Sequence, residues 1–137
     1  MSSGKITPDV SGQEKTILII DDDHDIGEML RTVITQQTNY RVVWIAESDL
    51  ALEAASHMRP SLLLLDYMMP TMDGLKLYDY LQDKPNMRGV PVVMISAWAT
   101  LPFEQIRERG MYMLRKPFDL SDLLDILAEL LSNESAS

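Results

Sequence analysis

The stretch that decides the fold runs from residue 61 to residue 75 and has the sequence SLLLLDYMMPTMDGL. Four consecutive leucines lead directly into Asp66, and Pro70 and Asp73-Gly74 follow soon after. An uninterrupted apolar run of this kind is typical of a strand that is buried on both faces, as in a parallel sheet. In open α/β sheets, ligands bind beyond the carboxyl ends of the strands. Asp66, a charged residue at the carboxyl end of a buried strand, is therefore the first candidate for a functional residue.

The composition is that of one folded domain with a single core, because 137 residues with 46% hydrophobic and 24% charged side chains are enough to bury one. We expect an N-terminal tail over residues 1–15, a domain over 16–132 and a short C-terminal tail over 133–137. The net charge of −9 disfavours direct binding to nucleic acid or to anionic membranes.

The absence of cysteine excludes disulfides, thiolate nucleophiles and zinc–thiolate sites, and it fits a reducing compartment. No apolar run approaches the ~20 residues that a membrane-spanning helix needs. The N-terminal residues also lack the hydrophobic segment of a secretion signal. Together these features predict a cytoplasmic protein without membrane insertion.

Apolar runs alternate with amphipathic segments along the chain. Strands are expected at residues 16–20, 41–45, 62–66, 90–95 and 111–115, and helices at 26–34, 49–58, 74–81, 101–109 and 120–131. Ser48 is expected to cap the second helix. The residues expected on its inner face are Leu50, Ala51, Ala54, Ala55 and Met58. This alternation predicts an α/β fold, a single doubly wound domain of five βα units with a parallel sheet and helices on both faces.

Polar residues follow four of the expected strands at matching places. Asp21 and Asp22 follow the first strand, Asp66 ends the third, Ser96 follows the fourth, and Lys116 follows the fifth. Because the carboxyl ends of parallel strands share one edge of the sheet, we expect these five side chains to converge.

Three clustered carboxylates repel one another unless a cation lies among them or one of them holds a proton. Oxygen ligands without histidine or cysteine favour a hard ion, and Mg²⁺ is the natural candidate. A lysine and a serine hydroxyl suit phosphate oxygens. A carboxylate nucleophile beside a metal ion and a lysine is suited to forming an aspartyl phosphate.

The chain resembles the receiver domain of two-component response regulators from about Thr16 to Leu131. Four motifs in order carry the resemblance: ILIIDDD at 17–23, LDYMMPTMDG at 65–74, ISA at 95–97 and KPF at 116–118. The resemblance implies a flavodoxin-like fold with strand order 2-1-3-4-5, an order that counting elements does not fix.

The resemblance also implies roles for individual residues. Asp66 corresponds to the phosphoacceptor, which takes its phosphoryl group from a phosphohistidine on a histidine kinase or a histidine phosphotransfer protein. Asp21 and Asp22 correspond to the Mg²⁺-binding pair, of which the second is the direct ligand in the family. Met68 would contribute its backbone carbonyl to the metal.

Ser96 corresponds to the hydroxyl residue that moves toward the phosphoryl group, and Lys116 to the lysine that pairs with its oxygens. The Lys116–Pro117 peptide bond is expected to be cis by the same analogy. The chain would then be a signalling module rather than an enzyme, with at most autophosphorylation from small donors and autodephosphorylation.

Output would pass through a downstream protein or through an output domain outside this chain. The family also implies a phosphorylation-linked dimer through the face formed by the last two helices and the strand between them (101–109, 111–115 and 120–131).

The chain departs from the family in the segment that should carry the signal outward. The position three residues before Lys116, usually aromatic, is Met113, with Tyr112 beside it. The segment from 96 to 116 is also shorter than usual and contains Pro102. In addition, Trp98 follows Ser96 by two residues, and its bulk is expected to slow water attack on the phosphorylated aspartate.

Two other functions remain open from the sequence. The first is a receiver-like interaction module that works without phosphate. The second is an Mg²⁺-dependent phosphohydrolase with an aspartyl-phosphate intermediate, in which Asp21 would be the nucleophile and Asp23 its partner. His24 and Asp25 do not continue the pattern of that class. His24 is not expected to bind the metal, because the other candidate ligands are all oxygens.

Overall fold

The computed structural model describes residues 15–70, 72–97 and 102–136. Most of the expected N-terminal tail, Trp98 and Leu101 lie outside the described residues. The strands are β2 (Thr16–Ile20), β3 (Arg41–Ile45), β4 (Leu62–Asp66), β5 (Val92–Ala97) and β6 (Tyr112–Lys116). The helices are α2 (His24–Gln37), α3 (Ser48–Ala55), α4 (Gly74–Gln82), α5 (Phe103–Glu108) and α6 (Leu120–Ala136), with a 3-10 turn, η1 (Pro85–Met87).

All neighbouring strands pair in parallel, in the order β3-β2-β4-β5-β6. Counted along the chain, this is the order 2-1-3-4-5, so the predicted flavodoxin-like fold is confirmed. The register places Ile20 beside both Ile45 and Leu65, and Asp66 beside Ile95. The last residues of the central strands therefore lie at one edge of the sheet, as the convergence of polar residues requires.

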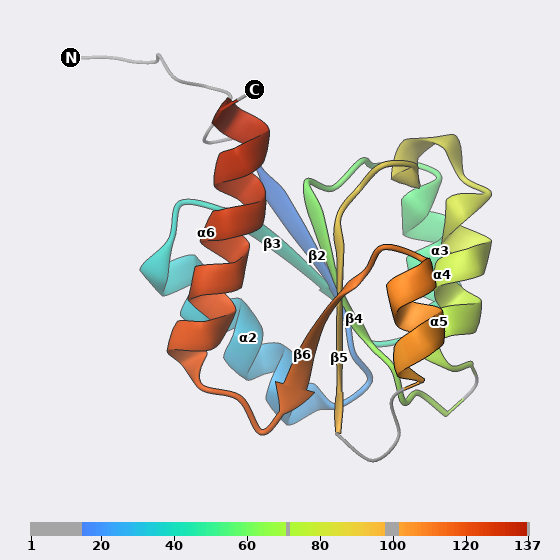
Figure 1. The fold of residues 1–137 in the computed structure, drawn as a ribbon, viewed down its shortest axis with the longest axis horizontal. Helices are drawn as coiled ribbons and strands as arrows, with labels where there is room; N and C mark the ends of the chain where they lie inside the picture. Colours follow the sequence, from blue (N-terminus) through green and yellow to red (C-terminus); the bar gives the residue numbers. More distant parts are fainter. Residues whose placement is uncertain (1–14, 71, 98–101, 137) are drawn as a thin grey trace.

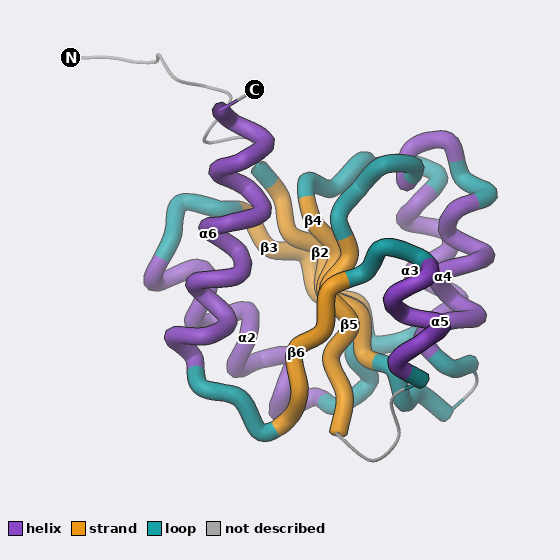
Figure 2. Tube along the Cα trace, viewed as in Figure 1, coloured by secondary structure: helices purple, strands orange, loops and turns teal. Residues whose placement is uncertain are grey.

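Helices cover both faces of the sheet, with α2 and α6 on one face and α3, α4 and α5 on the other (Figures 1 and 2). Successive residues of a strand point to opposite faces, so each central strand supplies both cores. Leu63 and Leu65 pack in the α3–α4–α5 layer, whereas Leu62 and Leu64 pack in the α2–α6 layer. This two-sided burial explains why β4 is an uninterrupted leucine run instead of an alternating pattern.

The second helix differs from its sequence prediction. Ser48 lies inside α3, Glu47 occupies the N-cap position without a side-chain hydrogen bond, and the helix ends at Ala55. Leu50, expected on the inner face, is 51% exposed, whereas Ala51 and Ala55 are buried as predicted. One residue corresponds to about 100° around a helix, so the small side chains next to Leu50 determine which face meets the sheet.

The C-terminal helix is longer than predicted. It continues to Ala136, whereas the sequence predicts a helix that ends at Leu131 and a tail over residues 133–137. The apolar periodicity stops at Leu131, so no hydrophobic pattern in the sequence marks the last residues of the helix. Within the described ranges, no helix is long and apolar enough to cross a membrane.

Two leucine substitutions test this assignment of core and surface. Replacing Leu64, which is fully buried, with alanine should lower the free energy of unfolding by about 2–5 kcal/mol, because it leaves a cavity in the α2–α6 layer. Replacing the exposed Leu50 with alanine should change the free energy of unfolding by less than about 0.5 kcal/mol. Urea denaturation followed by circular dichroism measures both, and equal losses would contradict the assignment.

Candidate functional site

The acidic loop between β2 and α2 is held by hydrogen bonds among its own residues and with the neighbouring strand β3. The Asp21 amide N–H donates to the Ile45 carbonyl oxygen at 3.1 Å, which extends the pairing of β2 with β3 by one residue. Asp21 Oδ1 accepts from the Asp23 amide N–H at 2.9 Å. The Asp23 side chain in turn caps α2 by accepting from the amides of Asp25 and Ile26. Asp23 is thus a helix cap, and Asp21 is buried with 1% exposure.

Asp66 is the last residue of β4 and is 4% exposed. The chain turns sharply after it, because the Asp73 side chain caps α4 and the Gly74 amide donates to the Tyr67 carbonyl oxygen at 2.7 Å. A Cβ atom on Gly74 would lie 3.0 Å from the Asp66 carbonyl oxygen. Asp73 and Gly74 therefore allow α4 to begin close to the backbone of Asp66.

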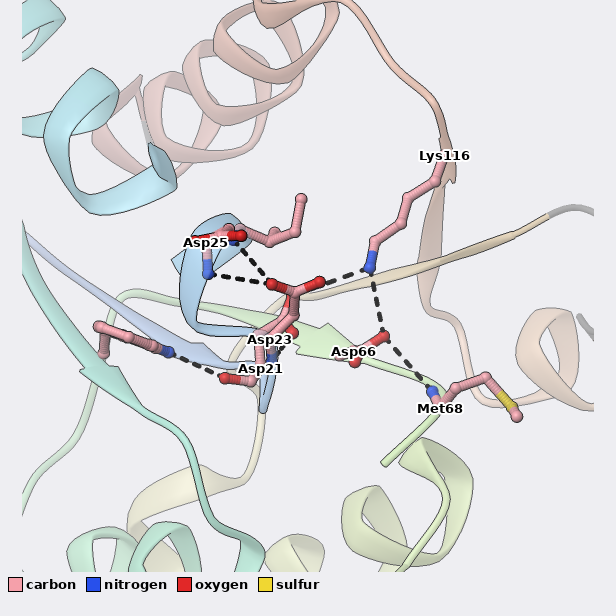
Figure 3. Close-up of polar contacts among 8 residues, drawn as sticks. Asp21, Asp23, Asp25, Asp66, Met68 and Lys116 are labelled. Carbon is pink, nitrogen blue, oxygen red and sulfur yellow. Dashed lines mark hydrogen bonds and ion pairs between the residues drawn. The ribbon is translucent and has the colours of Figure 1, made fainter. Parts of the chain in front are cut away.

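Lys116 reaches from the end of β6 toward two buried carboxylates (Figure 3). Its Nζ lies 3.8 Å from Asp66 Oδ1 and 4.0 Å from Asp21 Oδ2. Asp66 Oδ1 also accepts a long hydrogen bond of 3.4 Å from the Met68 amide. One lysine is thus shared between two aspartates, and neither contact is as close as a good ion pair.

The carboxylates of Asp21, Asp22 and Asp66 form a cluster whose nearest oxygens all lie within 4.8 Å of one another. Next to it is a cleft of about 290 Å³ at the carboxyl edge of the sheet. Its lining residues come from four strand ends: Asp22, Asp23, Asp66, Met68, Ser96, Ala97 and Lys116.

Burial raises the pKa of Asp66 to about 7, and the negative charge of Asp21 adds to this while Lys116 opposes it. Burial also raises the pKa of Asp21, against the hydrogen bond from Asp23 and the charge of Lys116. Without a cation, the pair therefore tends to hold a proton near neutral pH. Among the described residues, Asp21 Oδ2 is a buried side-chain oxygen with no hydrogen-bond donor. Three acidic oxygen donors and one unsatisfied buried oxygen fit a hard divalent cation.

The structure brings the candidate residues of the sequence analysis together at one edge: Asp21, Asp22, Asp66, Met68, Ser96 and Lys116. Ser96 is 2% exposed on β5 and lines the cleft, whereas the Met68 side chain is 55% exposed. The Lys116–Pro117 peptide bond is cis, as predicted.

One residue near the site is missed by sequence reasoning. The Trp44 indole Nε1–H donates to the Asp21 carbonyl oxygen at 2.9 Å. The sequence indicates only a β-rich strand at this position, because nothing in its spacing relates residue 44 to residue 21. His24 stacks edge-on against the Trp44 ring with centroids 5.2 Å apart, and it is not part of the acidic cluster.

The described part of the segment between residues 96 and 116 contains the departures from the family that the sequence analysis identifies. The short helix α5 comprises six residues, with Pro102 at its N-cap, and Gly110 follows it with φ of +73°. Tyr112 and Met113 on the edge strand β6 are 43% and 37% exposed.

Comparison with known proteins decides the family. The response regulator receiver domain model matches residues 17–128, most of the chain. The chain belongs to the response regulator receiver family. Receiver domains bind Mg²⁺ in an acidic pocket, and the cluster of three aspartates is a pocket of this kind.

Curated relatives of this receiver domain are longer proteins. The DNA-binding response regulator MtrA of Mycolicibacterium smegmatis is 37% identical over 81 residues, which cover 59% of this chain and 34% of MtrA. Response regulator Rre1 of Synechocystis is 27% identical over 125 residues, which cover 89% of this chain and 54% of Rre1. The chain thus spans from about a third to about half of the length of these relatives.

Solved receiver structures have the same fold. The chemotaxis protein CheY4 of Vibrio cholerae superposes with a TM-score of 0.78 at 25% identity, covering 86% of this chain and 99% of CheY4. The receiver domain of the sensor histidine kinase PA1611 of Pseudomonas aeruginosa superposes with a TM-score of 0.74 at 26% identity, covering 87% of this chain and 98% of that domain. The PA1611 structure has a magnesium ion coordinated in its active-site cleft.

The raised pKa of Asp66 predicts how its replacement changes stability with pH. An aspartate titrates near 3.8 in the unfolded chain and at about 7 here, so its protonation stabilises the fold below pH ~4, and this contribution is lost as the pH rises through ~7. Asp66→Asn, which has no charge to bury, should therefore raise the free energy of unfolding by roughly 1–3 kcal/mol at about pH 8 without divalent cations, and by less at about pH 5.

Urea denaturation in the presence of a chelator measures this difference. Asp125→Asn on the exposed surface of α6 is the matched control and should not show it. If the wild type and Asp66→Asn have equal free energies of unfolding at both pH values, burial does not destabilise the ionised form of Asp66, and the prediction is wrong.

Proposed function

We propose that this receiver domain accepts a phosphoryl group on Asp66 from the phosphohistidine of a histidine kinase or a histidine phosphotransfer protein. The observation that carries the proposal is the buried Asp66 carboxylate, which lies 3.8 Å from Lys116 Nζ and within the acidic cluster. A carboxylate in this setting is a nucleophile beside one fixed positive charge and a site for another.

The transfer begins when an Asp66 carboxylate oxygen attacks phosphorus in line with the bond to the donor imidazole. A P–O bond to Asp66 forms and the P–N bond breaks, and its electron pair stays on the imidazole nitrogen of the donor protein. Asp66 must be ionised to attack, and its pKa of about 7 makes the metal-free site a poor nucleophile in mildly acidic solution.

Lys116 and Ser96 act on the phosphoryl oxygens. The Lys116 ammonium lies between Asp66 and Asp21, and it turns to the phosphoryl oxygens once Asp66 is phosphorylated. The Ser96 hydroxyl, which lines the same cleft, donates a hydrogen bond to one of these oxygens.

Asp21, Asp22, Asp66 and the backbone carbonyl of Met68 would hold Mg²⁺, whose charge offsets that of the carboxylates and of the phosphoryl oxygens. The chemistry of the donors supports this choice, since all of them are oxygens and Asp21 Oδ2 has no hydrogen-bond donor among the described residues.

The signal then leaves through the face formed by α5, β6 and α6. Ser96 and Lys116 lie on the neighbouring strands β5 and β6, so their movement toward the phosphoryl group shifts this face. Exposed Tyr112 and Met113 give the edge strand an apolar surface for a downstream protein or a second copy of the domain. An ion pair of 2.9 Å between Arg109 and Asp79 ties the end of α5 to α4, which limits how far α5 moves.

We infer a cytoplasmic location and an output through a partner or a further domain. With a net charge of −9, this chain is poorly suited to contact DNA itself. MtrA, a DNA-binding response regulator, is matched over only 34% of its length.

Phosphoryl incorporation tests the proposal directly. In the presence of Mg²⁺ and acetyl phosphate, the wild-type chain should gain one acid-labile phosphoryl group, and Asp66→Asn should gain none. Asp125→Asn is again the control and should behave like the wild type, whereas Lys116→Ala should lose most of the incorporation. Intact-protein mass spectrometry measures the added mass.

Phosphotransfer from purified histidine kinases, with the same variants, then identifies the donor. Incorporation that persists in Asp66→Asn would place the phosphoryl group elsewhere. No incorporation from acetyl phosphate or from any kinase would favour the interaction module that works without phosphate.

A further inference from the structure

Trp44 connects the edge strand β3 to the acidic loop. Both backbone polar groups of Asp21 bind neighbours on β3: its N–H donates to the Ile45 carbonyl at 3.1 Å, and its carbonyl accepts from Trp44 Nε1–H at 2.9 Å. The first contact continues the ordinary strand pairing, whereas the second depends on one side chain.

Gly27 makes room for this side chain. It is a buried residue of α2, and a Cβ atom there would lie only 2.1–2.4 Å from the atoms Cε2, Nε1 and Cζ2 of Trp44. A glycine inside a helix is unfavourable by about 1 kcal/mol relative to alanine. The indole therefore occupies space that any other residue at position 27 would fill, and Trp44 and Gly27 form an interlocked pair.

The interlocked pair matters because repulsion among the carboxylates opposes the conformation that brings them together. Asp21, Asp22 and Asp66 repel one another when no cation lies between them. The backbone must then keep the loop in the conformation that binds the ion. If only a fraction of the molecules has that conformation, the apparent dissociation constant rises in inverse proportion to the fraction.

We propose that Trp44 is a positioning residue that holds the acidic loop in its cation-binding conformation, and that Gly27 serves to admit the Trp44 indole. Trp44 supplies no ligand atom and would act through the backbone carbonyl of Asp21. This inference rests on the Mg²⁺ site of the proposed function and adds a determinant of its affinity from a strand that supplies no ligand.

A titration with Mg²⁺, followed by ¹⁵N–¹H correlation NMR, measures the affinity without requiring phosphorylation. Trp44→Phe keeps an aromatic ring but removes the N–H donor. It should raise the dissociation constant for Mg²⁺ about three- to tenfold, the factor expected from losing one hydrogen bond. In the wild type, the Trp44 indole N–H resonance, identified by its absence in Trp44→Phe, should shift during the titration.

Gly27→Ala provides a second and independent variant. Its methyl group displaces the indole, so it should also weaken Mg²⁺ binding several-fold although alanine favours the helix. In the double variant the hydrogen bond that the methyl group would disrupt is already absent, so its affinity should equal that of Trp44→Phe. Val43→Ala on the same edge strand is the control and should leave the affinity unchanged.

The outcomes separate this inference from the proposed function. A wild-type protein whose spectrum does not respond to Mg²⁺ would overturn the metal site and the role of Trp44 together. Wild-type binding with an affinity that Trp44→Phe changes by less than twofold would overturn the role of Trp44 alone. If Trp44→Phe does not give a dispersed spectrum, Gly27→Ala decides, and unchanged affinity in that variant overturns the inference. If the double variant raises the dissociation constant for Mg²⁺ by the product of the two single-variant factors, Trp44 and Gly27 do not act as a pair.

Discussion

The mutual repulsion of three carboxylates at one sheet edge is the constraint on which the site depends. The pairing of β2 with β4 aligns Ile20 with Leu65, so the next residues, Asp21 and Asp66, are forced to be neighbours. Burial prevents water from screening them, and the shared Lys116 lies too far from either for a close ion pair. The metal-free site therefore lowers stability, and the same strain gives it affinity for a cation.

The two cores supply the stability that this arrangement requires. Each central strand buries alternate side chains in the α2–α6 layer and the α3–α4–α5 layer, so a run of leucines contributes on both faces. Substitution of a core leucine typically costs several kcal/mol, and the effective penalty of burying one ion in a protein is also several kcal/mol. A parallel sheet covered on both faces can therefore hold charged residues at its edge without unfolding.

The sequence predicts the features that depend on periodicity and on strand ends. The five strands follow from local pattern, and the convergence of Asp21, Asp66 and Lys116 follows from the geometry of parallel sheets. The strand order follows from family resemblance. The exposure of Leu50 is mispredicted, because helix rotation depends on how small side chains fit the sheet. The contact of Trp44 with the Asp21 backbone is not predictable, since it joins two strands through a side chain and needs the space at Gly27.

The site lies at the carboxyl ends of the strands and is thus supported by both edge strands of the sheet, β3 and β6. On one side, β3 holds the backbone of Asp21 through Ile45 and Trp44, and on the other, β6 supplies Lys116. These two supports differ in kind. The hydrogen bonds from β3 bind the backbone of Asp21, so they hold the loop whether or not the carboxylates are charged. The position of Lys116 depends on the charges of the groups with which it pairs. Phosphorylation should therefore leave the β3 side in place and displace the β6 side, which makes the signal run toward α5, β6 and α6.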